Sequence, residues 1–379
     1  MSSSEKSRPV GPVIYFDLEL EGIEFREDNV FSCLSGYDAV FTDCGRGAIR
    51  LISEYAGEGE VLVPDYSCNA IAQGFQNMIM VPYPMGENFV PDPDVLERLI
   101  TPRTRMISVN HFCGRLLDPE IIQGLLKLKE RYGLILHEDA TQSFLSAFQT
   151  FGDFCTTSLY KWFPVPAGAG LYSRTQLPET MKRPLRKRGE PPRAYAMILK
   201  TLLLRNEEGM DEDVRAISER WFDLFEEENV ANAELPVASM TELDRFLLSC
   251  HSVSYCQKKR SENAAALARM LHYDRIRPVW ERLPDERDAL LCYPVFVTRG
   301  NGVQNGRGFR SLMEMRDALQ HYLEEQEIYA PVYWRLKPPF GTFEESRRIC
   351  NQILCLPMDQ RYTIADMQRV ADAVNHWQE

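Results

Sequence analysis

Residues 39–67, AVFTDCGRGAIRLISEYAGEGEVLVPDYS, contain the pattern that decides the fold. The apolar run AVFT predicts a strand, GRGAIRLISEYAG predicts a helix that starts directly after it, and EVLVP predicts a second strand. A strand, a helix and a strand in this order are typical of a βαβ unit in a mostly parallel sheet. Ligands of such sheets bind at the carboxyl ends of the strands, so DCGRG and PDYS fall where a site is expected.

The alternation of strands and helices continues to about residue 175. Further strands are predicted at 79–84, 104–112 and 134–140, and further helices at 69–78, 92–100 and 119–133. We therefore expect an α/β fold with a mostly parallel central sheet between layers of helices. NHF (110–112) and EDATQ (138–142) also lie at strand ends, which strengthens the expectation of one shared site.

Three parts of the chain differ in pattern. We expect an N-terminal segment (1–37), a large domain (38–240) that ends in a helical insertion (176–240), and a C-terminal part (241–379). The C-terminal part begins with one long connecting helix at 241–272 and continues as a small α+β domain. Its predicted strands are 287–298 and 324–334, and its predicted helices are 311–326 and 363–377.

Composition narrows the class of protein. The 379 residues carry a net charge of -12, so a nucleic-acid partner is not expected. Apolar runs are too short for a membrane span, and the polar N-terminus lacks the apolar core of a signal peptide, so we expect a cytoplasmic protein. The ten cysteines form no CxxC pair and the six histidines are dispersed, so we expect reduced, buried thiols and no metal site.

Lys161 lies in SLYKWFPVPAGAG (158–170), followed by an aromatic pair, two prolines and two glycines. A flexible lysine on a solvated surface needs no such constrained setting. A lysine that forms a covalent imine does, because its nitrogen must be deprotonated, partly dehydrated and held in one direction. Lys161 is therefore the candidate nucleophile.

Asp139 ends the strand of LILHEDATQSF (134–144), and Gln142 follows three residues later. A carboxylate at that position could hold the ring N–H of a pyridine cofactor, and Gln142 could hydrogen-bond a ring oxygen of the same cofactor. The structural alternatives are an Asp that caps the next turn and a Gln that is simply a polar turn residue.

A phosphate site is predicted at the helix that begins with Gly45, Arg46 and Gly47. The glycines allow close approach of backbone N–H groups, and the N-terminus of a helix attracts anions. Hydroxyl groups just before the lysine, with Thr156 and Ser158 as candidates, complete the predicted phosphate cup.

Tyr66, His111 and Phe112 are candidates for stacking on a planar cofactor ring, because they lie at the ends of predicted strands. For the two aromatic residues, packing in the core is an equal alternative.

Taken together, these segments resemble the DegT/DnrJ/EryC1/StrS family of sugar aminotransferases, which are fold-type I pyridoxal-phosphate enzymes. The resemblance spans about residues 38–375. The segments that carry it are GRGAIR, VLVPDYSCNAI, NHFCGRLLD, LHEDATQSF, GDFCTTSLYKWFPVPAGAGLY, KKRSENAAALARML and ILCLPMDQRYTIADMQRV.

The resemblance implies a pyridoxal 5'-phosphate cofactor and a role for each matching residue. By this resemblance Lys161 is expected to be the Schiff-base lysine and to move protons, Asp139 to bind the pyridine nitrogen, and Gln142 to bind the ring hydroxyl. Gly45, Arg46 and Gly47 form the phosphate turn; the family's spacing points to Thr156 as the phosphate-binding hydroxyl, and other fold-type I enzymes point to Ser158. An amino acid donor, a keto acceptor and a homodimer with active sites at its interface are also implied.

Departures from the family keep other reactions open. Cys68 stands where many sugar aminotransferases have an aromatic residue over the ring, and the insertion at 176–240 is atypical. We therefore expect an aminotransferase whose acceptor is a nucleotide-linked keto sugar or another biosynthetic intermediate. The alternatives are a lyase, decarboxylase or condensing enzyme with the same cofactor, and a cofactor-binding regulator without turnover. The basic run at 182–188 is either a solvated segment or a clamp for a substrate phosphate.

Overall fold

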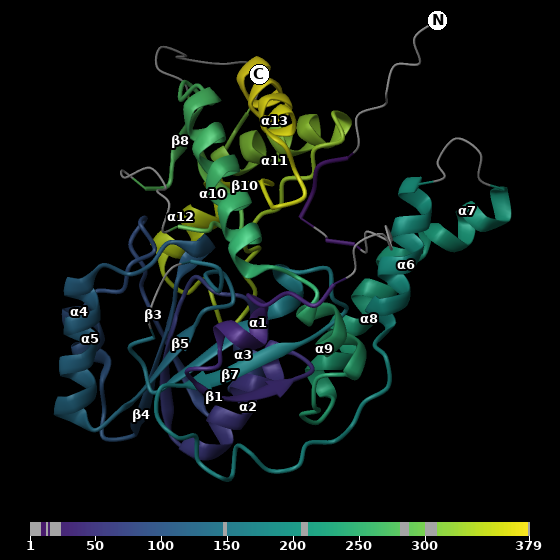
Figure 1. The fold of residues 1–379 in the computed structure, drawn as a ribbon. Coiled ribbons are helices and arrows are strands. Elements are labelled where there is room, and N and C mark those ends of the chain that lie inside the picture. The colour runs from purple at the N-terminus through teal and green to yellow at the C-terminus, as the bar shows by residue number, and fades with distance from the viewer. Residues whose placement is uncertain are drawn as a thin grey trace, which may run out of the picture.

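A seven-stranded sheet forms the centre of the larger part of the molecule (Figure 1). The computed structural model describes residues 9–12, 14–15, 24–146, 150–205, 211–280, 288–299 and 309–377. The strands, in spatial order, are β1 (Asp38–Thr42), β7 (Ala169–Ser173), β6 (Phe154–Ser158), β5 (Ile135–Asp139), β4 (Thr104–Asn110), β2 (Glu60–Pro64) and β3 (Ile79–Tyr83). β7 runs antiparallel to both of its neighbours, and the remaining pairs are parallel, which confirms the predicted fold class.

Helices cover both faces of this sheet. They are α2 (Gly45–Ala56), α3 (Asn69–Gly74), α4 (Pro93–Leu99) and α5 (Pro119–Tyr132). Successive side chains of a strand point to opposite faces. Accordingly Val61 and Val63 of β2 belong to the apolar cluster that includes α2 and α3, whereas Leu62 belongs to the cluster that includes α4 and α5. Burial on both faces explains why the strands are almost continuously apolar.

The C-terminal part differs from the sequence prediction at two places. The expected single helix at 241–272 is two helices, α9 (Glu242–Ser249) and α10 (Val253–Met270), because the Ser252 side chain caps a new helix by accepting from the N–H of Tyr255. The strand expected at 324–334 is absent from those residues, all of which the structure describes. Ile328 makes only an isolated bridge to Val10, and Pro331 has no N–H for a sheet.

A small antiparallel sheet lies above the large one in Figure 1. It contains β10 (Ile353–Leu356), β9 (Tyr293–Val297) and β8 (Ile276–Pro278), in that order. The other elements of the described chain outside the insertion are α1 (Val30–Cys33), η1 (Phe112–Gly114), η2 (Leu159–Lys161), α11 (Leu312–Glu325), α12 (Glu344–Gln352) and α13 (Ile364–His376). Residues 1–8, 13 and 16–23 of the expected N-terminal segment lie outside the described residues.

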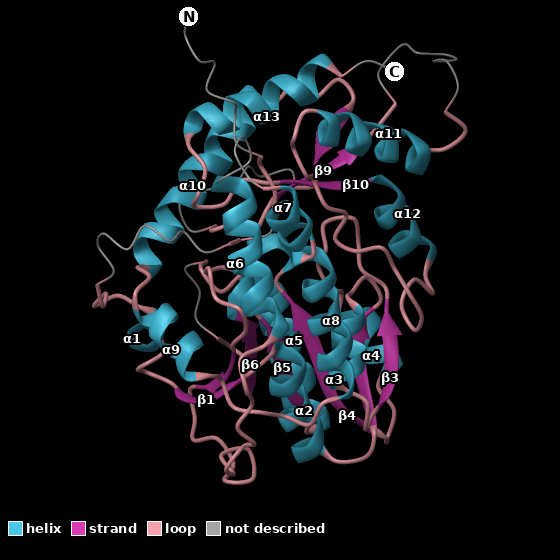
Figure 2. Ribbon diagram, turned by 90° about the vertical axis from the view of Figure 1, so that its right-hand side faces the viewer, coloured by secondary structure: helices cyan, strands magenta, loops and turns pink. Residues whose placement is uncertain are grey.

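The expected helical insertion contains α6 (Pro192–Arg205), α7 (Glu212–Glu219) and α8 (Trp221–Glu234). Figure 2 shows α6 and α8 in the foreground, with the small sheet above them and the large sheet below. The insertion therefore reaches the side of the molecule where the two sheets approach each other. None of the helices in the described ranges has the length and apolar character needed to cross a bilayer.

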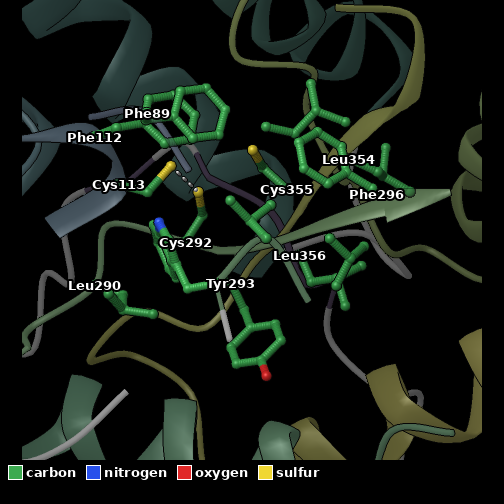
Figure 3. Packing of buried hydrophobic residues seen from close by; sticks show 14 of the residues in the cluster. Phe89, Phe112, Cys113, Leu290, Cys292, Tyr293, Phe296, Leu354, Cys355 and Leu356 are labelled. Carbon is green, nitrogen blue, oxygen red and sulfur yellow. Dashed lines mark hydrogen bonds between the residues drawn. The ribbon is translucent and has the colours of Figure 1, made fainter. Parts of the chain in front are cut away.

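Three cysteines that are far apart in the sequence meet in the core between the two sheets (Figure 3). The Sγ atoms of Cys113, Cys292 and Cys355 lie within 4.8 Å of one another, and those of Cys113 and Cys292 are 3.3 Å apart. Burial raises the pKa of the Cys113 and Cys292 thiols, so both are protonated and pack as small apolar groups at neutral pH. Sequence spacing alone did not predict this cluster.

Candidate active site

One cavity lies at the carboxyl ends of the parallel strands, where the sequence placed the site. It is lined by Cys44, Gly45, Arg46, Ile49, Cys68, Ala70, Ile71, Asn110, Asp139, Thr141, Gln142, Ser158, Tyr160, Lys161, Arg193, Asn232 and Trp334. The structure thus brings six predicted residues to one cavity: Gly45, Arg46, Asp139, Gln142, Ser158 and Lys161. Gly47, Tyr66, His111, Phe112 and Thr156 are not among its lining residues.

Lys161 ends η2, and its neighbours hold it in place. The Leu159 N–H donates to the Gly168 carbonyl at 2.9 Å, and Trp162 and Phe163 are fully buried. The Trp162 indole N–H donates to the Thr141 carbonyl at 2.9 Å, which ties the lysine turn to the loop that carries Gln142. The constrained sequence around Lys161 therefore anchors a half-buried side chain at the cavity wall.

Glycine is required at 168 in this turn. Its backbone φ is 99°, a value that residues other than glycine rarely adopt. In addition, a Cβ at this position would lie 3.0 Å from the Cε of Met240. The Gly168 N–H donates to the Asp43 carbonyl at 2.7 Å, so the lysine turn is also fixed to the segment that follows β1.

Asp139 is the last residue of β5 and is directly opposite Asn110 of β4 and Thr156 of β6. Its Oδ1 accepts from the Thr141 N–H at 2.9 Å, so part of the predicted capping role is present. The carboxylate is half-buried and lines the cavity, so it also faces the space in which a ligand would lie.

The side-chain amide of Gln142 has a hydrogen-bond partner for its oxygen but, among the described residues, not for its nitrogen. Its Oε1 accepts from the Cys113 N–H at 2.8 Å. Its Nε2 is buried and has no partner among the described residues. A buried donor without a partner is costly, and here it belongs to a side chain that lines the cavity. A ligand oxygen at this position would satisfy it.

The N-terminus of α2 forms one end of the cavity. The Cys44 side chain at its N-cap makes no cap hydrogen bond, and Gly45 is so close to β6 that an added Cβ would lie 3.5 Å from the Ser158 Cβ. Ser158, the last residue of β6, adds a hydroxyl at the same end, and the Arg46 Nε donates to Gln73 Oε1 at 2.5 Å. Uncapped N–H groups, a hydroxyl and a cation at one helix terminus suit a phosphate.

Gly47 does not line the cavity, and its lack of a side chain instead allows close packing at the start of α2. A Cβ at Gly47 would lie 3.3 Å from both Asp43 Oδ1 and Val237 Cγ1, so a larger residue would push apart the segments that pack on the start of α2.

The Thr156 hydroxyl does not line the cavity and is hydrogen-bonded to a buried histidine. Its Oγ1 hydrogen-bonds His137 Nε2 at 2.9 Å, and His137 Nδ1 bonds Ser108 Oγ at 2.9 Å. Burial lowers the pKa of His137 to about 4, against the opposing effect of Asp139 and Glu138, so the imidazole is neutral at neutral pH. Of the two hydroxyl candidates, Ser158 lies at the cavity and Thr156 supports the floor beneath Asp139.

The three stacking candidates are buried beside the cavity. Tyr66 donates its hydroxyl to the Tyr333 carbonyl at 2.5 Å, and Phe112 stacks on Phe89 with 3.6 Å between ring centroids. His111 Nε2 lies 3.2 Å from Glu138 Oε2. These contacts account for all three as packing and hydrogen-bonding residues of the core, which was the alternative for Tyr66 and Phe112.

Other residues form the walls where a ring would lie. Cys68 and Trp334 line the cavity, and Asn110 contributes a buried Oδ1 that has no partner among the described residues. Asn110 directly precedes His111 in the NHF segment. Its position at a strand end could therefore have identified it as a residue of the site. Trp334 comes from a distant part of the chain, and no local pattern pointed to it.

The basic run at 182–188 is largely paired within the protein. Lys182 bonds Asp38, Arg183 bonds Glu54, and Arg188 bonds both Asp43 and Glu228. Arg188 is therefore not available as a phosphate clamp, because its guanidinium neutralises two buried carboxylates. For Arg188 the structure thus contradicts the clamp interpretation, and Arg193, five residues later, lines the cavity.

The fold is that of the fold-type I transferases, and a lysine, a carboxylate and an uncapped helix N-terminus meet at its strand ends. The chain matches the model of the DegT/DnrJ/EryC1/StrS aminotransferase family over residues 35–170. It is thus an enzyme of the pyridoxal-phosphate-dependent transferase class.

Two relatives and one structure illustrate the likeness. The dTDP-3-amino-3,4,6-trideoxy-alpha-D-glucose transaminase of Streptomyces venezuelae is 25% identical over 370 residues, covering 95% of this chain and 87% of the relative. A "pleiotropic regulatory protein" of Geobacillus stearothermophilus is 24% identical over 371 residues, covering 88% and 85%. The fold is similar to that of NtdA from Bacillus subtilis, crystallised with bound cofactor PMP, with a TM-score of 0.60, 19% identity and coverage of 89% and 72%.

Proposed function

We propose that this protein is an aminotransferase that moves an amino group from an amino acid donor to a keto acceptor, with a nucleotide-linked keto sugar as the acceptor class. The observation that carries the proposal is the meeting of Lys161, Asp139 and the unpartnered Gln142 Nε2 in one cavity. The Streptomyces venezuelae relative, a transaminase by name, supports the choice of a sugar acceptor.

The residues present fit pyridoxal 5'-phosphate. The Asp139 carboxylate would hold a ring N–H, Gln142 Nε2 would donate to the ring hydroxyl, and Ser158 with the N-terminus of α2 would hold the phosphate. Bound there, the cofactor supplies an electron sink for charge that develops on the substrate carbon.

Lys161 has two tasks in this proposal. Its Nζ would hold the cofactor through a covalent bond, and its amine, once free, would carry the proton between the reacting carbons. The buried neighbours Trp162 and Phe163 hold that amine in position and keep water from the turn. The Asp139 carboxylate would accept a hydrogen bond from the ring N–H and so hold the proton there.

A half-reaction tests this function. We expect the absorbance of the lysine-bound cofactor to disappear on addition of an amino acid such as L-glutamate, and to return on addition of the keto acceptor. A lyase or decarboxylase would consume its substrate without leaving the amino form of the cofactor. The regulator alternative, which the name of the Geobacillus relative favours, requires cofactor binding without this conversion.

The Gln142 donor can be tested by Gln142→Glu. The new side chain keeps an acceptor for the Cys113 N–H but lacks the Nε2 donor. Loss of the hydrogen bond to the ring hydroxyl is expected to weaken cofactor binding by about 10-fold. A spectroscopic titration of the apoenzyme measures this. Unchanged affinity in a variant with the wild-type melting temperature would contradict the assigned role.

We also propose a homodimer. Apolar side chains are exposed on α6 at Tyr195, Ile198 and Leu202, which share one helix face, and on the neighbouring helices at Ile217 and Phe222. A second copy of the chain would cover this patch. Light scattering should give twice 43.7 kDa for the wild type and a smaller mass for the Ile198→Asp, Phe222→Asp double variant. A monomeric wild type would contradict the proposal.

A further inference from the structure

Arg193 links the cofactor cavity to a second, wider cavity. The second cavity shares Arg46, Cys68, Ala70, Tyr160, Lys161, Arg193 and Trp334 with the first. It continues away from the sheet toward Met197, Phe225 and Asn229 of the insertion. A substrate that reaches Lys161 through this space passes the guanidinium of Arg193.

The surroundings of Arg193 hold its guanidinium in one place. The side chain is 2% exposed and belongs to the first turn of α6. Its Nη1 donates to the Pro166 carbonyl at 3.2 Å and its Nη2 to Asn229 Oδ1 at 3.1 Å. Its Cζ lies 4.1 Å from the ring centroid of Tyr160, the residue before Lys161, and 4.4 Å from that of Phe225. The rings cover the flat face of the guanidinium, so a ligand meets its N–H edge.

The charge of Arg193 has no counter-ion within the described chain. No carboxylate there forms a salt bridge with it, and its Nε is buried without a hydrogen-bond partner. Arg188 of the same insertion bonds two carboxylates, and all three nitrogens of the buried Arg50 donate to carbonyl groups. A buried cation with an unused donor is costly, and a bound anion would remove that cost.

We propose that Arg193 is the anion anchor of the substrate cavity and binds a carboxylate of the amino donor. This inference rests on the proposed aminotransferase function. The Nε–H and the N–H groups that remain on Nη1 and Nη2 provide the planar fork that a carboxylate accepts. The contact of the guanidinium with Tyr160 places the anchor beside the lysine, which suits the short distance between the amino and carboxylate groups of an amino acid. The phosphate-binding features of the cofactor cavity lie instead at the N-terminus of α2 and at Ser158.

Calorimetric titration with glutarate tests the anchor without turnover, because glutarate has two carboxylates and no amino group. We expect the holoenzyme to bind glutarate and Arg193→Gln to bind it about 10- to 100-fold more weakly, while cofactor affinity stays unchanged. Arg193→Lys keeps the charge but not the fork, so its affinity should be intermediate. Arg183→Gln is the matched control, because that arginine is exposed and paired with Glu54.

Several outcomes would overturn the anchor. One is wild-type glutarate affinity in a folded Arg193→Gln protein. Another is weaker cofactor binding with unchanged glutarate binding, which would assign Arg193 to the cofactor phosphate. If Arg193→Gln does not fold, the affinities of the wild-type holoenzyme for glutarate and for its uncharged diamide are compared instead. Equal affinities would contradict a carboxylate site. Failure of the half-reaction with intact glutarate binding contradicts only the proposed function.

Discussion

Lys161→Ala is expected to reduce the rate of the amino-donor half-reaction by at least about 10⁴-fold, because the substitution removes both the covalent attachment and the proton carrier. Lys161 is half-buried at the cavity and its backbone is fixed by the Leu159–Gly168 hydrogen bond, so the loss of its side chain should not unfold the turn. Stopped-flow absorbance with L-glutamate measures the rate. The bound cofactor should also lose its lysine-bound absorbance.

Lys187→Ala is the control for this experiment, since Lys187 is exposed and does not line the cavity. It should retain the wild-type rate. A Lys161→Ala enzyme that kept more than about a tenth of the activity would assign the chemistry to another group, because general acid–base catalysis alone contributes at least about 10²-fold.

Arg188→Met is expected to lower the free energy of unfolding by about 3–5 kcal/mol, because it leaves two carboxylates buried without a cation. Arg188 Nη1 lies 3.1 Å from Asp43 Oδ2 and Nη2 lies 2.8 Å from Glu228 Oε2, and both carboxylates are almost fully buried. Burial already raises the pKa of Asp43, and Arg188 opposes that shift. Urea unfolding followed by circular dichroism measures the loss.

Arg183→Met provides the matched comparison for that loss. Its pair with Glu54 is largely exposed, so we expect a change below about 1 kcal/mol. If both variants lost a similar free energy of unfolding, the ion pairs of Arg188 with Asp43 and Glu228 would not be important for stability. Arg188 also donates to Asn232 Oδ1 at 2.7 Å, so its loss should weaken one wall of the cofactor cavity as well.

The sheet and the position of the cavity were predictable because both depend on local patterns. Strand and helix periods alternate clearly between 38 and 173, and parallel strands bring their carboxyl ends to one edge. Lys161, Asp139 and Gln142 stand directly at such ends, so their convergence needed no knowledge of distant contacts. The break between α9 and α10 was missed because a single capping serine decides it within an otherwise helical pattern.

Details that depend on distant partners were not predictable. Thr156 and Ser158 share one face of β6, and only the contact of Thr156 with His137 separates a supporting hydroxyl from one at the cavity. In the same way the sequence does not distinguish Arg188, at the end of the basic run, from Arg193, five residues later. Arg188 meets Asp43 and Glu228, whereas Arg193 meets two aromatic rings and a cavity.

The central claim is that Lys161 binds the cofactor covalently. Borohydride reduction of the enzyme with pyridoxal 5'-phosphate, followed by peptide mass spectrometry, tests it most directly. We predict one modified peptide that contains Lys161 and a loss of the modification when L-glutamate is added before the reduction. Modification of a different lysine, or none in a protein that binds the cofactor, would contradict the account.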